Sequence, residues 1–175
     1  METCRIVLLG DSYVGKSSAL MTYVNNEFPV YIPALANSFE NIIMDGTLPV
    51  RLVMSEAPAH AHFDQLRHFA LRFADVFIVC FSPNDATSFN NITEKWIPEI
   101  AEVHARATVI VACLKNDLRE NRQDNGGGAW IDEDIASELV GLKTEGVTIK
   151  GYYECSALEN TGLDDLFLNA YRVIK

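Results

Sequence analysis

The chain has 175 residues, and its 14 Lys plus Arg against 24 Asp plus Glu give a formal net charge of -10. This acidic balance argues against nucleic acid or an anionic membrane surface as a direct partner. Hydrophobic residues are 49% and charged residues 22%, a balance typical of a soluble globular protein, and the length predicts one domain over residues 1–175. No apolar run is long enough to span a bilayer, and the N-terminal METCRIVLLG predicts a strand rather than a signal peptide.

Five short apolar runs are rich in β-branched or aromatic residues and are mostly continuous rather than alternating. Such runs are typical of strands that are buried on both faces of a parallel sheet. In chain order they cover residues 4–10, 50–54, 75–82, 107–114 and 152–157. A further segment, residues 37–46, is expected to pair with residues 50–54 as a hairpin that turns at Asp45, Gly46 and Thr47.

Helical patterns lie between these runs. They cover residues 16–24, 61–73, 86–103, 132–140 and 163–174. Pro98 is expected to kink the third of them near its end, and the polar, Gly-rich residues 120–128 predict a surface loop. Strands that alternate with helices predict the α/β class, as a three-layer sandwich with a mostly parallel six-stranded sheet and about five helices.

The four cysteines predict the redox environment. None of them forms a CxxC pair, and three of the four lie within or at the end of apolar runs. Buried, reduced thiols are therefore expected, which favours a cytoplasmic location.

The segment GDSYVGKS, residues 10–17, matches the phosphate-loop pattern G-x-x-x-x-G-K-[ST], with a predicted strand before it and a predicted helix after it. Glycine at Gly10 and Gly15 lets the backbone bend and turn its N–H groups toward phosphate oxygens. Lys16 would reach the β- and γ-phosphates, and the Ser17 hydroxyl would bind Mg²⁺ at the positive end of the helix. The remaining residues expected around the phosphates are Asp11, Ser12, Tyr13, Val14 and Ser18.

Other segments indicate a family. These are LKNDLR at residues 114–119, ECSAL at residues 154–158, SFNNITEKWIPEI at residues 88–100, and FP followed by YIP near residue 30. Together with the phosphate loop they resemble the Ras superfamily of small GTPases, and most closely its Rho family. The resemblance covers essentially the whole chain.

The resemblance implies a guanine site. Asp117 matches the aspartate that accepts two hydrogen bonds from the guanine ring, and Lys115 matches the lysine whose stem lies along the base. The backbone at Ala157 matches the donor to the guanine carbonyl, and Phe28 matches the aromatic side chain near the base. Leu114 stands where the family has Asn or Thr, so one polar tether is missing. The resemblance adds Leu118, Ser156 and Leu158 to the expected cofactor site.

The first switch segment departs from the family. In the family, a threonine of this segment binds Mg²⁺ through its hydroxyl and senses the γ-phosphate through its backbone. In this chain Ala34 stands in place of that threonine. Alanine keeps the N–H group but has no oxygen for the metal. The next residues, Leu35 and Ala36, also differ from the family's effector-contacting sequence.

The second switch segment normally reads D-T-A-G-Q, and this chain has EAPAH at residues 56–60. Glu56 keeps the charge of the metal-binding aspartate but is one methylene longer. Ala59 replaces the glycine that turns toward the γ-phosphate, and Pro58 beside it lacks an N–H group and fixes φ. His60 stands where a glutamine orients the attacking water. Because histidine titrates near pH 7 it could act as a base, but the favoured interpretation places His60 on a solvated surface.

The combined expectation is a guanine-nucleotide-binding signalling module that binds GTP or GDP, holds Mg²⁺ less strongly than its relatives, and hydrolyses GTP slowly or not at all. No residue is assigned as catalytic; His60 and Ala34 are named only for their switch positions. Two alternatives stay open: a working GTPase that uses His60 or a partner's arginine, and a nucleotide-free interaction scaffold. The expected protein partners are effectors and regulators of Rho-type signalling, with membrane attachment only through a lipidated tail after Lys175.

Overall fold

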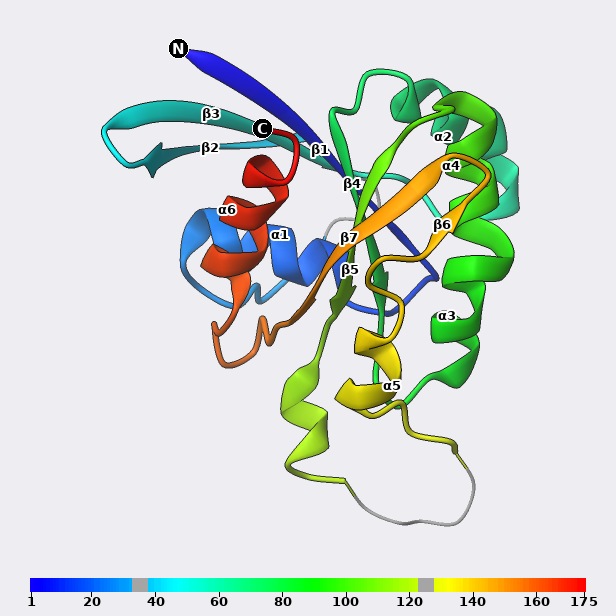
Figure 1. Cartoon of the computed structure of the whole chain (residues 1–175). Coiled ribbons are helices and arrows are strands. Elements are labelled where there is room, and N and C mark those ends of the chain that lie inside the picture. The colour runs from blue at the N-terminus through cyan, green and yellow to red at the C-terminus, as the bar shows by residue number, and fades with distance from the viewer. Residues whose placement is uncertain (33–37, 123–127) are drawn as a thin grey trace.

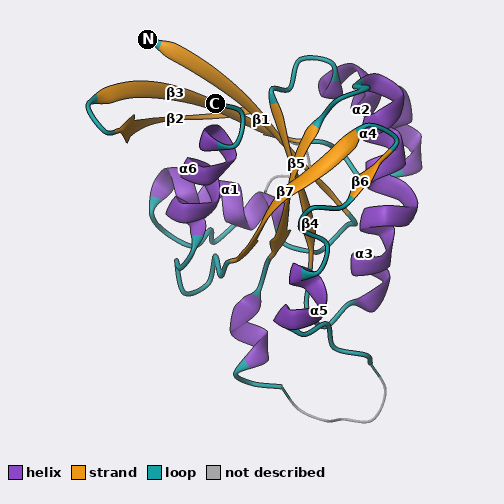
Figure 2. Cartoon of the chain, in the orientation of Figure 1, coloured by secondary structure: helices purple, strands orange, loops and turns teal. Residues whose placement is uncertain are grey.

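A computed structural model describes residues 1–32, 38–122 and 128–175 of the chain. A seven-stranded sheet in the order β2-β3-β1-β4-β5-β7-β6 forms its middle layer. Helices α1 (Lys16–Asn25) and α6 (Leu163–Arg172) cover one face, and α2 (Asp64–Leu71), α3 (Ala86–Asn91) and α4 (Ile97–Val103) cover the other (Figures 1 and 2). The predicted three-layer α/β architecture is therefore confirmed.

Of the seven strands, five overlap the apolar runs that predict them. Their bounds are β1 (Glu2–Gly10), β2 (Ser38–Asp45), β3 (Leu48–Glu56), β4 (Val76–Phe81), β5 (Thr108–Cys113), β6 (Lys143–Thr144) and β7 (Val147–Glu154). The pairs β1–β3, β1–β4, β4–β5 and β5–β7 are parallel, whereas β2–β3 and β6–β7 are antiparallel. The expected hairpin is confirmed, since Asp45 pairs with Leu48 across Gly46 and Thr47.

Two details of the sheet differ from the expectation. The strand predicted over residues 152–157 begins at Val147 instead, because the polar Thr148 and Lys150 interrupt the apolar run without breaking the strand. The two-residue strand β6 adds a seventh strand to the six expected, and it pairs with the start of β7. A strand of this length has no periodicity that a sequence could reveal.

Apart from α1, which reaches one residue beyond its prediction, the helices are shorter or more divided than their patterns predict. Residues 61–73 form a 3₁₀ turn, η1 (Ala61–Phe63), followed by α2, and the helix expected over residues 132–140 is α5 (Glu133–Ser137). A second 3₁₀ turn, η3 (Asn116–Arg119), follows β5. Among the described residues, none of the helices has the length and apolar character needed to cross a bilayer.

The predicted kink near Pro98 takes the form of a π-helical turn, η2 (Ile92–Trp96), between α3 and α4. The N–H group of Ile97 donates to the carbonyl of Ile92, five residues earlier. Proline lacks an N–H group and its ring crowds the preceding turn, so a wider turn accommodates it. The disturbance falls just before Pro98 rather than at the end of the helix.

Two apolar clusters lie on opposite faces of the sheet. One includes Ala19 of α1 and Phe167 of α6, and the other includes Leu71 of α2 and Ile100 of α4. All four cysteines are buried and free, as expected, and burial raises the pKa of Cys80 to about 12. Because helices pack against both faces of the sheet, the ends of its strands are held in place. The loops of the candidate site emerge from these strand ends.

Candidate nucleotide site

The phosphate loop connects β1 to α1 and has the backbone that its glycines predict. Gly10 has φ +148°, and a Cβ atom there would lie 2.5 Å from the carbonyl oxygen of Cys80. Gly15 has φ +105°, a region that residues with side chains rarely adopt. Both positions therefore require glycine for this path of the backbone.

Lys16 is held in the loop by main-chain oxygens. Its Nζ atom donates to the carbonyls of Gly10 and Asp11, each at 2.7 Å, and the residue is only 4% exposed. Burial lowers the pKa of the ammonium group, and the negative charges of Glu56 and Asp11 oppose that shift. A buried cation beside a loop of backbone N–H groups is suited to an anion such as a phosphate.

The side chain of Asp11 turns away from the candidate phosphate site. Its Oδ1 accepts a hydrogen bond from Nε1 of Trp96 at 2.9 Å, and its Oδ2 accepts one from Nδ2 of Asn91 at 2.7 Å. The loop is thereby bonded to the α3–η2 segment, which is 80 residues further along the chain.

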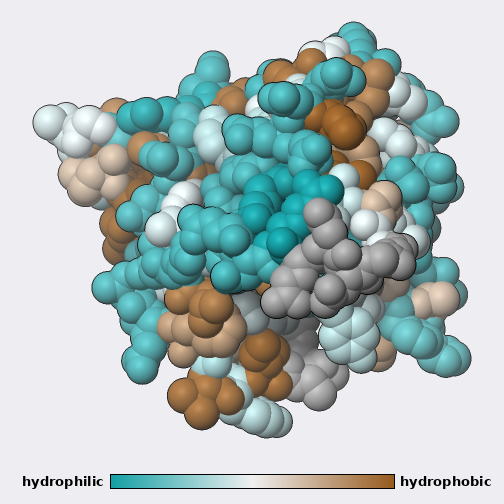
Figure 3. All heavy atoms as spheres, turned by 90° about the horizontal axis from the view of Figure 1, so that it is seen from below, coloured by the Kyte–Doolittle hydropathy of each residue, from teal (hydrophilic) through white to brown (hydrophobic). Residues whose placement is uncertain are grey.

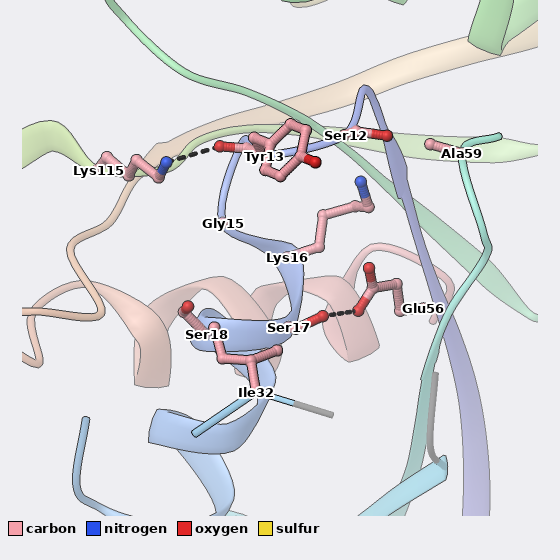
Figure 4. A pocket seen from close by; sticks show the side chains of 10 residues that line it. All are labelled: Ser12, Tyr13, Gly15, Lys16, Ser17, Ser18, Ile32, Glu56, Ala59 and Lys115. Atoms are coloured by element: carbon pink, nitrogen blue, oxygen red, sulfur yellow. Dashed lines mark hydrogen bonds between the residues drawn. The ribbon is translucent and has the colours of Figure 1, made fainter. Parts of the chain in front are cut away.

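Ser17 and Glu56 meet at the metal position that the motif predicts. The Ser17 hydroxyl donates to Oε2 of Glu56, and Figure 4 shows the two side chains facing each other below Lys16. A hydroxyl and a carboxylate are hard oxygen donors that suit Mg²⁺, which commonly completes its octahedron with phosphate oxygens and water. The residues present therefore fit the metal, although the described residues contain no group of three or more His, Cys, Asp or Glu that could hold one alone.

A cavity of about 540 Å³ opens over the loop (Figure 4). It is lined by Ser12, Tyr13, Gly15, Lys16, Ser17, Ser18, Ile32, Glu56, Ala59 and Lys115. A second cavity of about 140 Å³ is lined by Gly15, Ser18, Ala19, Phe28, Leu114, Lys115, Asp117, Ala157 and Leu158. The two share Gly15, Ser18 and Lys115, so a phosphate compartment and a smaller, more apolar compartment adjoin.

The smaller compartment is built on hydrogen bonds from distant loops. Oδ1 of Asp117 accepts from the Ser156 hydroxyl at 2.7 Å, which in turn accepts from the Glu159 N–H group at 3.0 Å. Nζ of Lys115 donates to the carbonyl of Tyr13 at 2.6 Å, which joins this compartment to the phosphate loop. Leu114 is 2% exposed and cannot make such a polar link.

Most of the predicted binding residues line one of the two cavities, and four do not. Val14 is buried in the core, Asp11 contributes its carbonyl, and Ser156 lies behind Asp117; Leu118 lines neither cavity. Sequence reasoning did not assign Ile32 or Ala19 to the site. Ile32 belongs to the YIP segment and Ala19 follows Ser18 by one residue, so both could have been inferred from the motifs beside them.

Extended from EAPAH through the end of α2, the second switch segment covers residues 56–71, and it is anchored by Arg67. This fully buried guanidinium donates to Glu99 from Nε at 2.7 Å and from Nη2 at 2.9 Å. Its Nη1 donates to the carbonyls of Pro58 at 2.8 Å and His60 at 3.4 Å. The hinge beside Pro58 is therefore tied to α4 through one side chain.

His60 is exposed, and it is not among the residues that line either cavity. Its Nδ1 accepts a hydrogen bond from the His62 N–H group at 3.1 Å, and the two rings stack at 4.7 Å. The Nδ1 atom of His60 is therefore engaged by a hydrogen bond within its own segment rather than directed at a cavity. Ala34, the other switch position, lies outside the described residues.

The strand order, the phosphate loop and the two adjoining cavities define a small-GTPase type of α/β domain. Residues 5–175 match the Ras family. The chain is 36% identical over 174 residues to the Rho-related GTP-binding protein RhoV of Rattus norvegicus, covering 95% of this chain and 72% of that protein. The RhoV proteins of Mus musculus and Homo sapiens are each 35% identical with the same coverage. The chain therefore belongs to the Ras family and is a Rho-like small GTPase, as its motifs predict.

Proposed function

We propose that this chain binds GDP and GTP, with the phosphates in the larger cavity and the guanine in the smaller one. The proposal rests on the way in which the two cavities adjoin at Lys115. Lys115 contacts the phosphate loop at Tyr13, and Asp117 of the same turn lines the smaller cavity. An aspartate at the end of an apolar slot selects a base that offers N–H donors on two adjacent atoms, a ring nitrogen and an exocyclic amine, which guanine does and adenine does not.

Calorimetric titration of the purified, nucleotide-stripped protein with GDP, GTP and ADP in Mg²⁺ buffer tests the proposal. Binding of both guanine nucleotides with ADP at least about a hundredfold weaker is expected, because a buried polar group that loses its partners is costly. Equal affinity for ADP would remove the guanine assignment. No heat with any nucleotide would favour the scaffold alternative.

Magnesium is proposed to bind beside Ser17 and Glu56, with the phosphates and water as its other ligands. With alanine at position 34 the hydroxyl of the family's threonine is missing, so the metal should contribute less to nucleotide affinity than in relatives. EDTA should therefore accelerate GDP release only modestly, and Ala34→Thr should increase that acceleration. Acceleration in the unchanged protein as steep as in an ordinary small GTPase would contradict this account.

Hydrolysis of GTP is proposed to be slow or absent. Phosphoryl transfer in this architecture needs an oriented water and a metal clamp on the β- and γ-phosphates. The exposed His60 accepts a hydrogen bond from the His62 N–H group, which argues against a water-positioning role. The Pro58 carbonyl accepts a hydrogen bond from Arg67, which argues against a freely moving hinge. Single-turnover assays should show little GDP formation, and His60→Gln alone should not restore it. A hydrolysis rate typical of small GTPases would contradict the proposal and would show that a residue of this chain supports the reaction.

The protein is proposed to act in the cytoplasm on effector and regulatory proteins of Rho-type signalling. Exposed apolar side chains on the second switch segment, Leu66 and Phe69, offer contact area to such partners. Viewed from below in Figure 3, hydrophilic residues occupy the middle of the face and hydrophobic ones form separate groups toward its edges. Affinity capture with the GDP-loaded and GTP-loaded protein tests this, because a signalling partner should prefer one of the two forms.

A further inference from the structure

Trp96 contacts both the phosphate loop and the second switch segment. We propose that Trp96 is a positioning residue that fixes the phosphate loop through Asp11 and links it to the second switch segment through Arg67. The inference rests on the proposed nucleotide binding, and it concerns how that same site is held and regulated.

The first contact is with the loop. Nε1 of Trp96 and Nδ2 of Asn91 each donate to one carboxylate oxygen of Asp11, at 2.9 Å and 2.7 Å. The carbonyl of the same Asp11 accepts a hydrogen bond from Nζ of Lys16 at 2.7 Å. The side-chain bonds of Asp11 therefore determine where its carbonyl lies, and with it where the phosphate-binding ammonium group lies.

The local structure places Trp96 at this contact. Trp96 is the last residue of the π-helical turn and is only 1% exposed. One extra residue in a helical turn rotates the side chains before it relative to those after it, and such turns are frequent at functional sites. Asn91 ends α3 and Trp96 ends η2, and the turn brings both donors onto one carboxylate.

The second contact is with the switch. The guanidinium of Arg67 lies 5.3 Å from the centroid of the Trp96 ring, and Nζ of Lys95 lies 4.6 Å from it. Arg67 donates to the backbone carbonyls of Pro58 and His60. A displacement of Asp11 when phosphates bind would therefore be transmitted through one rigid indole to the residue that holds the switch hinge.

The loop contact is tested by the rate at which a fluorescently labelled GDP leaves the Mg²⁺-loaded protein. Trp96→Phe keeps an aromatic ring and removes the N–H donor, and a lost hydrogen bond to a charged group should accelerate release about tenfold or more. Trp130→Phe is the matched control, because Trp130 is the second of the two tryptophans, lines neither cavity and contacts Arg122 instead. Its release rate should stay within about twofold of the unchanged protein.

A double variant in which the carboxylate and the amide exchange positions separates a positioning role from general damage to the core. Asn91→Asp places two carboxylates against each other and should also accelerate release about tenfold. Adding Asp11→Asn restores a donor and an acceptor in the opposite order, while an oxygen remains for Trp96. The double variant should return to within about threefold of the unchanged rate. Acceleration in the two single variants with rescue in the double variant supports the loop contact.

The link to the switch is tested by amide hydrogen exchange in the GDP-bound state. Trp96→Phe should accelerate exchange at least about threefold in residues 58–71, with β4 as the internal reference that stays unchanged. Unchanged exchange there would overturn the link, and unchanged GDP release in Trp96→Phe and Asn91→Asp would overturn the loop contact. If the unchanged protein binds no labelled GDP, the proposed function fails and this inference fails with it.

Discussion

The Ser17 hydroxyl donates a hydrogen bond to the carboxylate of Glu56, although the two residues are 39 positions apart in the chain. Ser17 is the second residue of α1, the helix after the phosphate loop, and Glu56 ends β3, the strand that pairs with β1. The longer side chain of glutamate therefore still reaches the expected metal position.

Glu56→Gln should weaken the effect of Mg²⁺ on GDP retention. The amide keeps the size of the side chain and removes the charge that favours a divalent cation, so the Mg²⁺ concentration that halves GDP release should rise about tenfold. The measurement is GDP release over a series of free Mg²⁺ concentrations. Glu40→Gln is the matched control, because Glu40 pairs with Arg51 on the β2–β3 hairpin and lines no part of the larger cavity. An identical Mg²⁺ dependence in both variants would show that Glu56 does not hold the metal.

Asp117→Ala should weaken GDP binding by about 3 kcal/mol, because two charge-assisted hydrogen bonds to the base are lost together. Ser156→Ala removes only the hydroxyl that orients Asp117, so a smaller loss of about 1 kcal/mol is expected. Titration calorimetry with GDP and ADP measures both. The weak binding of ADP should be unaffected by Asp117→Ala, and a parallel loss for ADP would point to collapse of the cavity rather than loss of base recognition.

GDP affinity should fall as pH rises in the alkaline range. Burial lowers the pKa of Lys16 below 10.5 in the nucleotide-free protein, and a bound phosphate should raise that pKa again. Between the two values binding takes up a proton, and affinity decreases by up to about tenfold per pH unit. Calorimetry in two buffers of different ionisation enthalpy measures the uptake. Lys16→Arg should bind without it because guanidinium stays charged, and equal uptake in that variant would assign the proton to another group.

Arg67→Ala should lower the free energy of unfolding by about 3–5 kcal/mol, because Glu99 and two backbone carbonyls lose their partner in a buried environment. Arg67→Lys should lose less, since the charge remains but the planar bidentate contact does not. Urea denaturation followed by circular dichroism measures both. Arg51→Ala is the control, because its pair with Glu40 is exposed and should contribute under 1 kcal/mol. Equal losses at positions 51 and 67 would show that burial adds nothing to the Arg67 network.

Much of the fold and part of the candidate site could be predicted from sequence because their causes are local. Continuous apolar runs predicted the five main strands, and Asp45, Gly46 and Thr47 predicted the turn of the hairpin. Gly10 and Gly15 adopt positive φ, so the phosphate loop is encoded by adjacent residues. The guanine residues were carried over by resemblance, and their assignment stays a prediction until nucleotide binding is measured.

The tertiary structure decided which side chains are buried and which distant side chains contact each other. Helical spacing marks Leu66 and Phe69 as an apolar stripe, yet both are exposed, and the charged Arg67 between them is fully buried. Periodicity records which residues share a helix face but not which face packs against the sheet, and Glu99 on a distant helix makes the burial of Arg67 possible. The bond between Asp11 and Trp96 likewise joins residues 85 positions apart, so it exists only once β1 and the π-helical turn are packed side by side.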